Sequence, residues 1–346
     1  MRRIAISLML VLCLTLALPM FAQAADTSIT VFNWYDYIDE SVIKMFEEET
    51  GIQVKYANFT TNEEMYAKLN AGAGSYDVIF PSDYIIERMI REDGLEPLNF
   101  DNMPNARGVI DWMQKPSYDP TGEYSVAYMW GTVGILYNTE YVDGEITSWQ
   151  TMFDPAYKKD VFMLDSIRDA LGVTLKMLGY PINSKEPAHL EEAKQALLKQ
   201  KADGIVKGYL VDETKDKMIA GEAAMALMWS GDALYSMAEN DMLAYAVPEE
   251  GSNVWVDGMC IPKGARNKEA AEQFIDFLCR PDVARMNMDY IYYSTPIQAV
   301  VDEMSEEEKS NETLNPPQST VDRCEFFNDI SQDMEIYDRI WMEIRG

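Results

Sequence analysis

The sequence predicts an α/β fold of two lobes with a ligand cleft between them. Three observations support this prediction. The chain has 346 residues, a length that suits about two domains. Strands alternate with amphipathic helices in the first third of the chain and again from residue 161. A long β-rich run separates these two regions. Strand–helix–strand order with short joins predicts parallel strands linked by right-handed crossovers.

The first α/β region contains three predicted strands, each followed by a helix. The strand SITVFNW, residues 28–34, precedes a helix over 39–50 that a glycine would end. The strand IQVKYA precedes a helix whose start carries a predicted capping box, in which Thr61 and Glu64 each bond to the other's backbone N–H. The strand YDVIFPS leads into a helix near 84–92. This order predicts a parallel sheet covered on both faces.

The second α/β region begins with a strand at 161–166 and continues with a long polar helix at 186–200 and a strand at 223–230. The run at 124–138 is long enough to leave one lobe and enter the other. Residues 243–265 suit a return crossing, with a proline and a glycine at the bend. We therefore expect several crossings between the lobes, and a cleft where they meet.

The first 24 residues have the pattern of a secretory signal. A basic start precedes an apolar run at 4–18, and small residues follow at Ala22 and Ala24. The run is too short for a membrane span. Cys13 leaves a lipoprotein signal as the alternative. We expect cleavage after Ala24 and a protein that is periplasmic, or anchored at the cell surface if it carries lipid.

Composition excludes several classes of function. Cleavage after Ala24 removes two arginines and no acid, which takes the formal net charge from −29 to −31. Such a surface repels nucleic acid and anionic lipid. The chain has one histidine, His189, which argues against histidine zinc sites and Ser-His-Asp triads. The cysteines Cys260, Cys279 and Cys324 allow at most one disulfide. No phosphate loop is present, and we expect neither a cofactor nor a metal.

Rings and carboxylates recur together at the ends of the predicted strands, where open α/β sheets bind ligands. The five strand ends are Trp34–Tyr37, Ser82 with Tyr84, Asp165–Asp169, Trp229–Asp232 and Trp255–Asp257. Taken singly, each pair would be explained by core packing or by a helix cap. Aromatic faces attract ammonium groups by about 0.5–2 kcal/mol each. Carboxylates add charge-assisted hydrogen bonds. The recurrence therefore predicts a cleft for an apolar chain with cationic ends, a diamine or polyamine.

At these residues the sequence resembles the periplasmic spermidine/putrescine-binding proteins of polyamine ABC transporters, over about residues 27–341. The stretches that carry the resemblance include FNWYDYI, ETGIQVKY, YDVIFPSDY, MWGTVGILYN, MWSGDA and VWVDGMCIPKGA. The resemblance implies a type II periplasmic-binding-protein fold whose two α/β lobes close over putrescine or spermidine. It also implies delivery to a membrane permease with a cytoplasmic ATPase. We expect the protein to be a monomer and not an enzyme.

The resemblance also implies which residues touch the ligand. The aromatic residues that it assigns are Trp34, Tyr37, Tyr84, Trp229, Trp255 and Tyr293. The polar residues that it assigns are Asp36, Ser82, Asp169, Asp232 and Asp257. Asp232 matches an acid of the putrescine-selective branch. Ser166 and Phe327 stand where spermidine binders can have an aspartate and a glutamine. We therefore expect putrescine to bind at least as well as spermidine.

The lobe boundaries follow from the predicted crossings. The first lobe is expected to comprise residues 27–135 and 257–303, and the second lobe residues 136–256 and 304–346. Two alternatives stay open. Paired acids such as Asp169 and Asp257 would suit a secreted glycoside hydrolase. The abundant tyrosines would suit a ferric-iron-binding protein of the same fold.

Overall fold

The computed structural model describes residues 27–72 and 75–346, so the predicted signal peptide lies outside the described residues. The strands are β1 Ser28–Trp34, β2 Gln53–Phe59, β3 Val78–Ile79, β4 Ser125–Asn138, β5 Val161–Leu164, β6 Val206–Leu210, β7 Met225–Trp229, β8 Leu243–Ala246 and β9 Val254–Cys260. They pair in the order β2-β1-β3-β9-β4-β7-β5-β6, with β8 also on β4. The mixed α/β class predicted from the sequence is confirmed.

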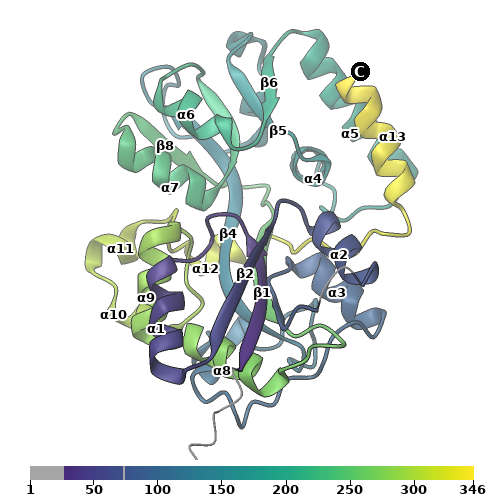
Figure 1. The fold of residues 1–346 in the computed structure, drawn as a ribbon. Helices are drawn as coiled ribbons and strands as arrows, with labels where there is room; N and C mark the ends of the chain where they lie inside the picture. Colours follow the sequence, from purple (N-terminus) through teal and green to yellow (C-terminus); the bar gives the residue numbers. More distant parts are fainter. Residues whose placement is uncertain (1–26, 73–74) are drawn as a thin grey trace, which may run out of the picture.

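Helices pack around this sheet in both halves of the molecule (Figure 1). Their bounds are α1 Glu40–Thr50, α2 Asn62–Asn70, α3 Asp83–Arg91, α4 Ile167–Met177, α5 Pro187–Ala202, α6 Glu213–Ile219, α7 Ser230–Glu239, α8 Lys268–Leu278, α9 Pro281–Ile291, α10 Gln298–Glu303, α11 Glu306–Ser310, α12 Gln318–Val321 and α13 Met334–Arg345. In the described part of the chain, none of them is long and apolar enough to cross a membrane.

The long strand β4 joins the two halves, as the β-rich run predicted. Its first part, Ser125–Thr132, pairs with β9, and its second part, from Val133 on, pairs with β7 and β8. The buried apolar residues separate at the same point. One core draws on residues 29–130 and 254–304, and the other on residues 133–227 and 330–344. We call the half around the first core the first lobe, and the half around the second core the second lobe.

The ends of the first two helices show which local predictions hold. The Asp39 carboxylate accepts a hydrogen bond from the N–H of the second residue of α1, and Gly51 ends that helix with a φ of 72°. At α2 the capping box is only half present. The Thr61 side chain accepts from Glu64 N at 3.1 Å. The Glu64 carboxylate accepts instead from Thr60 N at 2.9 Å and Thr60 Oγ1 at 2.7 Å. The predicted reciprocal bond was wrong because Thr60 offers two donors.

Two features of the sheet differ from the prediction. Only Val78 and Ile79 of the third predicted strand belong to β3, and β3 pairs with an antiparallel partner, β9. The first-lobe part of the sheet is therefore mixed, because β9 returns from the second lobe. Strand β6 was not predicted, since VKGYL lacks a clear alternation of apolar and polar residues. Cys260, Cys279 and Cys324 are free thiols, and both Cys260 and Cys279 are buried.

Candidate functional site

A buried carboxylate, Asp257, lies in β9 among hydroxyl groups of the first lobe. Its Oδ2 accepts from Tyr37 Oη at 2.8 Å, and its Oδ1 accepts from Ser82 Oγ at 2.6 Å. Within residues 27–72 and 75–346, no lysine or arginine forms an ion pair with it. Burial raises the pKa of Asp257 to about 6, although the hydrogen bonds from Ser82 and Tyr37 oppose this shift. The protein itself therefore leaves this acid without a cation.

Aromatic rings enclose the same acid. The Tyr293 ring lies perpendicular to Trp255, with 4.8 Å between the ring centres, and 6.0 Å from the Tyr37 ring. Burial raises the pKa of Tyr37 and of Tyr293 well above the usual tyrosine range, so both phenols stay neutral. The indole Nε1 of Trp255 is buried without a hydrogen-bond partner. The structure thus brings together five of the residues that the sequence assigned, which we call the Asp257 cage: Tyr37, Ser82, Trp255, Asp257 and Tyr293.

A buried asparagine that the sequence analysis missed positions this side of the site. Asn62, the first residue of α2, donates to Ser82 Oγ and to Tyr84 Oη, both at 3.0 Å. Its Oδ1 accepts from Ser82 N at 3.1 Å. Tyr84 Oη in turn donates to Glu63 at 3.2 Å. The position of Asn62, directly after the helix cap Thr61, is visible in the sequence. Its role is not, because its partners Ser82 and Tyr84 lie far from it in the chain.

Two glycines allow the lobes to meet at the cage. A Cβ at Gly231, in α7 of the second lobe, would lie 2.1 Å from Tyr293 Cδ1. A Cβ at Gly131, in β4, would lie 2.7 Å from Trp255 Cζ2 and 2.5 Å from Ser230 Oγ. Neither distance is compatible with a side chain at the present positions. The absence of a side chain at these two places lets the rings of the cage contact the second lobe.

A second buried acid, Asp169, lies in the first turn of α4 in the second lobe. Ser166 caps this helix, and its Oγ donates to Asp169 Oδ2 at 2.5 Å. Burial raises the pKa of Asp169 to about 6, opposed by Ser166 and then by Arg168. Ser166 therefore contacts the acid that the resemblance assigned to the ligand. Asp169 Oδ2 thus already accepts one hydrogen bond from within the protein.

Arg168 brings a positive charge to the lobe boundary, and the sequence analysis did not assign it. Its guanidinium carbon lies 4.3 Å from the centre of the Phe327 ring and 5.3 Å from that of Tyr84. It also donates to the carbonyl of Asn328 at 3.1 Å. Asp83, a buried acid that was also not assigned, has a pKa raised well above its usual range by burial, and Arg168 opposes this shift. The aromatic side chain at Phe327 thus packs on a cation of the protein.

Four assigned residues have partners outside the cage. Asp36 lies in an exposed turn after β1 with a φ of 52°, and it accepts from Tyr290 Oη at 2.6 Å. Asp232, in the first turn of α7, forms an ion pair of 3.1 Å with Lys215. Trp34 donates through Nε1 to the carbonyl of Phe80 at 2.8 Å. Trp229 is half-buried at the end of β7 and packs against the second core. Their assignment to the ligand stays a prediction.

The chain matches the family model of bacterial extracellular solute-binding proteins over residues 41–316. It belongs to this family. It is 32% identical over 335 residues to the spermidine/putrescine-binding periplasmic protein of Salmonella typhimurium, covering 96% of both chains. It is 30% identical over 362 residues to the putrescine-binding periplasmic protein SpuD of Pseudomonas aeruginosa, covering 97% of both.

A solved structure gives the same fold. The spermidine/putrescine ABC transporter substrate-binding protein PotD of Streptococcus pneumoniae superposes with a TM-score of 0.84 at 35% identity, and the match covers 92% of this chain and 98% of that one. The solute-binding-protein fold predicted from the sequence is therefore confirmed. Within residues 27–72 and 75–346, no group of three or more His, Cys, Asp or Glu side chains could hold a metal ion.

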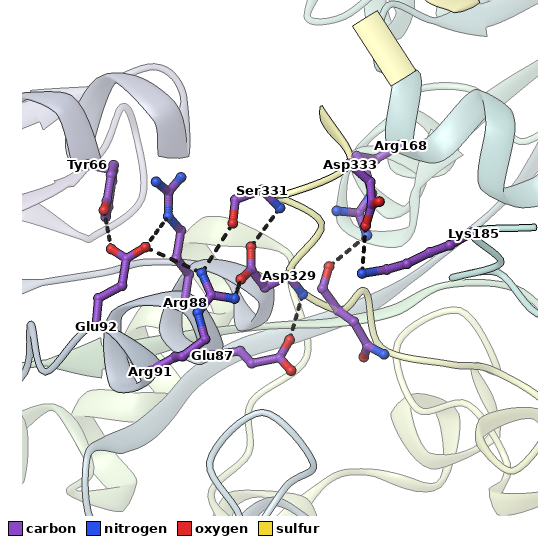
Figure 2. Close-up of polar contacts among 11 residues, drawn as sticks. Tyr66, Glu87, Arg88, Arg91, Glu92, Arg168, Lys185, Asp329, Ser331 and Asp333 are labelled. Atoms are coloured by element: carbon purple, nitrogen blue, oxygen red, sulfur yellow. Dashed lines mark hydrogen bonds and ion pairs between the residues drawn. The ribbon is translucent and has the colours of Figure 1, made fainter. Parts of the chain in front are cut away.

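In this solute-binding protein, a polar network ties the first lobe to the segment between α12 and α13, which leads into the second lobe (Figure 2). Arg91 of α3 forms an ion pair with Asp329. Glu87, one turn earlier on α3, accepts from Asp329 N at 2.6 Å. On the other side, Lys185 pairs with Asp333 at 2.8 Å. Both lobes thus hold this crossing segment through charged side chains.

A cavity of about 460 Å³ lies at the same crossing and not at the cage. Trp112 of the first lobe, Asn183 of the second lobe and Phe326 of the crossing line it. Trp112 also contacts Trp130 edge to face, with 5.3 Å between the ring centres. Because Asp257 does not line this cavity, its size carries no information about the ligand of the cage.

Proposed function

We propose that this solute-binding protein captures a polyamine, putrescine or spermidine, between its lobes and passes it to an ABC permease with a cytoplasmic ATPase. The observation that carries the proposal is Asp257, a buried carboxylate with only neutral hydroxyl donors among three aromatic rings. A buried charge without a partner is costly, and an external ammonium group would remove that cost. The curated relatives named for spermidine and putrescine support the same ligand class.

The geometry supports a specific role for each residue. One ammonium group of the ligand would bind to the Asp257 carboxylate, and Trp255 and Tyr293 would pack against the methylene chain. Cation–π attraction to these rings would add about 0.5–2 kcal/mol. The second ammonium group would bind to Asp169, where Ser166 already orients one oxygen. The two cationic ends of a diamine would thus each meet one of these two acids, Asp257 and Asp169.

Closure of the lobes completes the site in this proposal. Asp257 and Tyr37 belong to the first lobe, whereas Asp169 belongs to the second lobe. Only a closed form offers both acids to one ligand, so the ligand stabilises that form. The protein would be a monomer outside the cytoplasmic membrane, free in the periplasm or anchored by lipid at Cys13. We propose no catalytic activity, because binding and release suffice for transport.

Calorimetric titration of the mature protein with putrescine, cadaverine, spermidine and spermine tests this function. We expect putrescine to bind at least as tightly as spermidine. Butane-1,4-diol, which has the length of putrescine without its charges, is the control and should not bind. Absence of binding by all four amines would contradict the function. Spermidine that binds about tenfold tighter than putrescine, a difference of about 1.4 kcal/mol, would contradict the ligand length only.

A further inference from the structure

Lys215 lies where the two lobes meet, beside an acid that the sequence analysis assigned to the ligand. Its Nζ is 3.1 Å from Asp232 Oδ1. The side chain of Lys215 is 33% exposed to solvent, and that of Asp232 is 22% exposed. Lys215 belongs to α6 and Asp232 to α7, two helices that pack against each other in the second lobe. In the described part of the chain, no other basic side chain forms an ion pair with Asp232.

The Lys215–Asp232 pair is close to the Asp257 cage. Burial raises the pKa of Tyr293, and Asp232 and then Asp257 raise it further, so this ring lies in the field of both acids. Gly231, next to Asp232 in the chain, touches the same ring. Asp232 is thus near enough to influence a ligand that contacts Tyr293.

The pair also faces the first lobe. Lys215 Nζ lies 5.8 Å from the centre of the Tyr235 ring, and that ring contacts Tyr292 of the first lobe edge to face at 5.7 Å. Burial disfavours the charge of Lys215, but Asp232, Asp212 and Asp36 together hold the pKa of this lysine above its usual range. Asp36 belongs to the first lobe, so a carboxylate of the opposite lobe also favours the charged form of Lys215.

We propose that Lys215 is a specificity-determining residue whose ammonium group occupies Asp232 and thereby withdraws that acid from the ligand. This inference rests on the proposed polyamine function. A diamine needs two acceptors, which Asp257 and Asp169 supply. A third nitrogen would need a further acceptor, because a buried ammonium group without one is costly. Near Asp232 that nitrogen would instead meet the like charge of Lys215.

Lys215→Met tests the proposal, because methionine keeps most of the side-chain length and removes the charge. The matched control is Lys217→Met, on the same helix, where Lys217 pairs with Glu222 at 3.2 Å. Calorimetry with putrescine and spermidine is the measurement. We expect Lys215→Met to tighten spermidine binding about tenfold and putrescine binding less than about threefold, and the control to change either by less than about threefold.

Two further variants show whether the effect passes through Asp232. Adding Asp232→Asn to Lys215→Met should remove the gain for spermidine, whereas Lys215→Arg should keep the wild-type ratio of affinities. If Lys215→Met leaves the ratio of spermidine to putrescine affinity unchanged while the wild type binds putrescine, the role of Lys215 is overturned. The proposed polyamine function then still stands. A gain that persists in the double variant would also overturn the role of Lys215. If wild type and control bind no polyamine, the proposed function fails, and this inference fails with it.

Discussion

Asp257 and Asp232 are two carboxylates near the meeting surface of the lobes, and their partners differ. Asp257 accepts hydrogen bonds from two neutral hydroxyls, those of Tyr37 and Ser82. Asp232 forms an ion pair with Lys215. Both are partly or wholly removed from water, which disfavours their negative charge. Only Asp232 receives a compensating charge from the protein.

The difference shows that an acid near a cleft does not by itself predict a cation site. A buried carboxylate that lacks a positive partner gains most from a ligand ammonium group. A carboxylate already paired with lysine gains little, because the ligand must replace an existing interaction. The comparison leads to five predictions, which begin with the largest expected effect.

Asp257→Asn should weaken putrescine binding by about 2–5 kcal/mol, because it leaves a buried ammonium group without its charged partner. Asp302→Asn is the matched control, since Asp302 is exposed in α10 and its carboxylate accepts a hydrogen bond from the Gln298 amide at 2.8 Å. It removes the same charge and should have little effect, because exposed charges are screened over about 8 Å at physiological salt. Equal losses in calorimetry would show that general acidity attracts the ligand.

Binding should weaken as the pH falls below about 6, because burial raises the pKa of Asp257 and of Asp169 to about 6. The ligand prefers the ionised acids, and below that pH the free protein is protonated. Protonation of each acid should lower the affinity for putrescine by up to about tenfold for every pH unit below the pKa of that acid. Titrations from pH 7 to pH 5 measure this, and Asp257→Asn should flatten the profile.

The same acids should affect the stability of the protein without ligand in the opposite direction. Their pKa values are higher in the folded protein than in the unfolded chain, so their contribution to stability is present at low pH and is lost as the pH rises through about 6. Melting temperatures with and without putrescine should therefore diverge from pH 5 to pH 7. A ligand-induced shift that is constant over this range would contradict the role of both acids.

Gly231→Ala should weaken putrescine binding about tenfold, because the new methyl group would collide with the Tyr293 ring and hold the lobes apart. Gly208→Ala is the control, since a Cβ there would have no neighbour closer than 3.7 Å. Small-angle scattering with ligand should give a larger radius of gyration for Gly231→Ala than for wild type. Identical radii and affinities would show that the contact is not needed for closure.

Asp232→Asn should weaken putrescine binding by less than about 1 kcal/mol, the usual range for partly exposed ion pairs. The substitution removes an acid that Lys215 already neutralises, so the ligand loses little. Calorimetric titration of Asp232→Asn and Asp257→Asn with putrescine under the same conditions compares the two losses of affinity directly. A loss as large as that of Asp257→Asn would mean that Asp232 binds the ligand and that Lys215 moves away when it does.

Much of the fold could be predicted from the sequence, because it depends on local periodicity. Alternating strands and helices, the glycine that ends α1 and the long β4 are patterns over a few neighbouring residues. The ring and acid residues of the site were also visible, because strand ends in an open sheet are predictable places for ligands. Strand β6 was missed for the same reason, since its local pattern is weak.

Only the tertiary structure decided which of the assigned side chains share an environment. Asn62 orients Ser82, and Arg168 packs on Phe327, through contacts between segments far apart in the chain. Lys215 meets Asp232 because α6 and α7 pack side by side. Sequence by itself determined which charges and rings the protein has near its cleft. The pairing of those charges depends on distances of a few ångströms between helices, and no local pattern of residues specifies them.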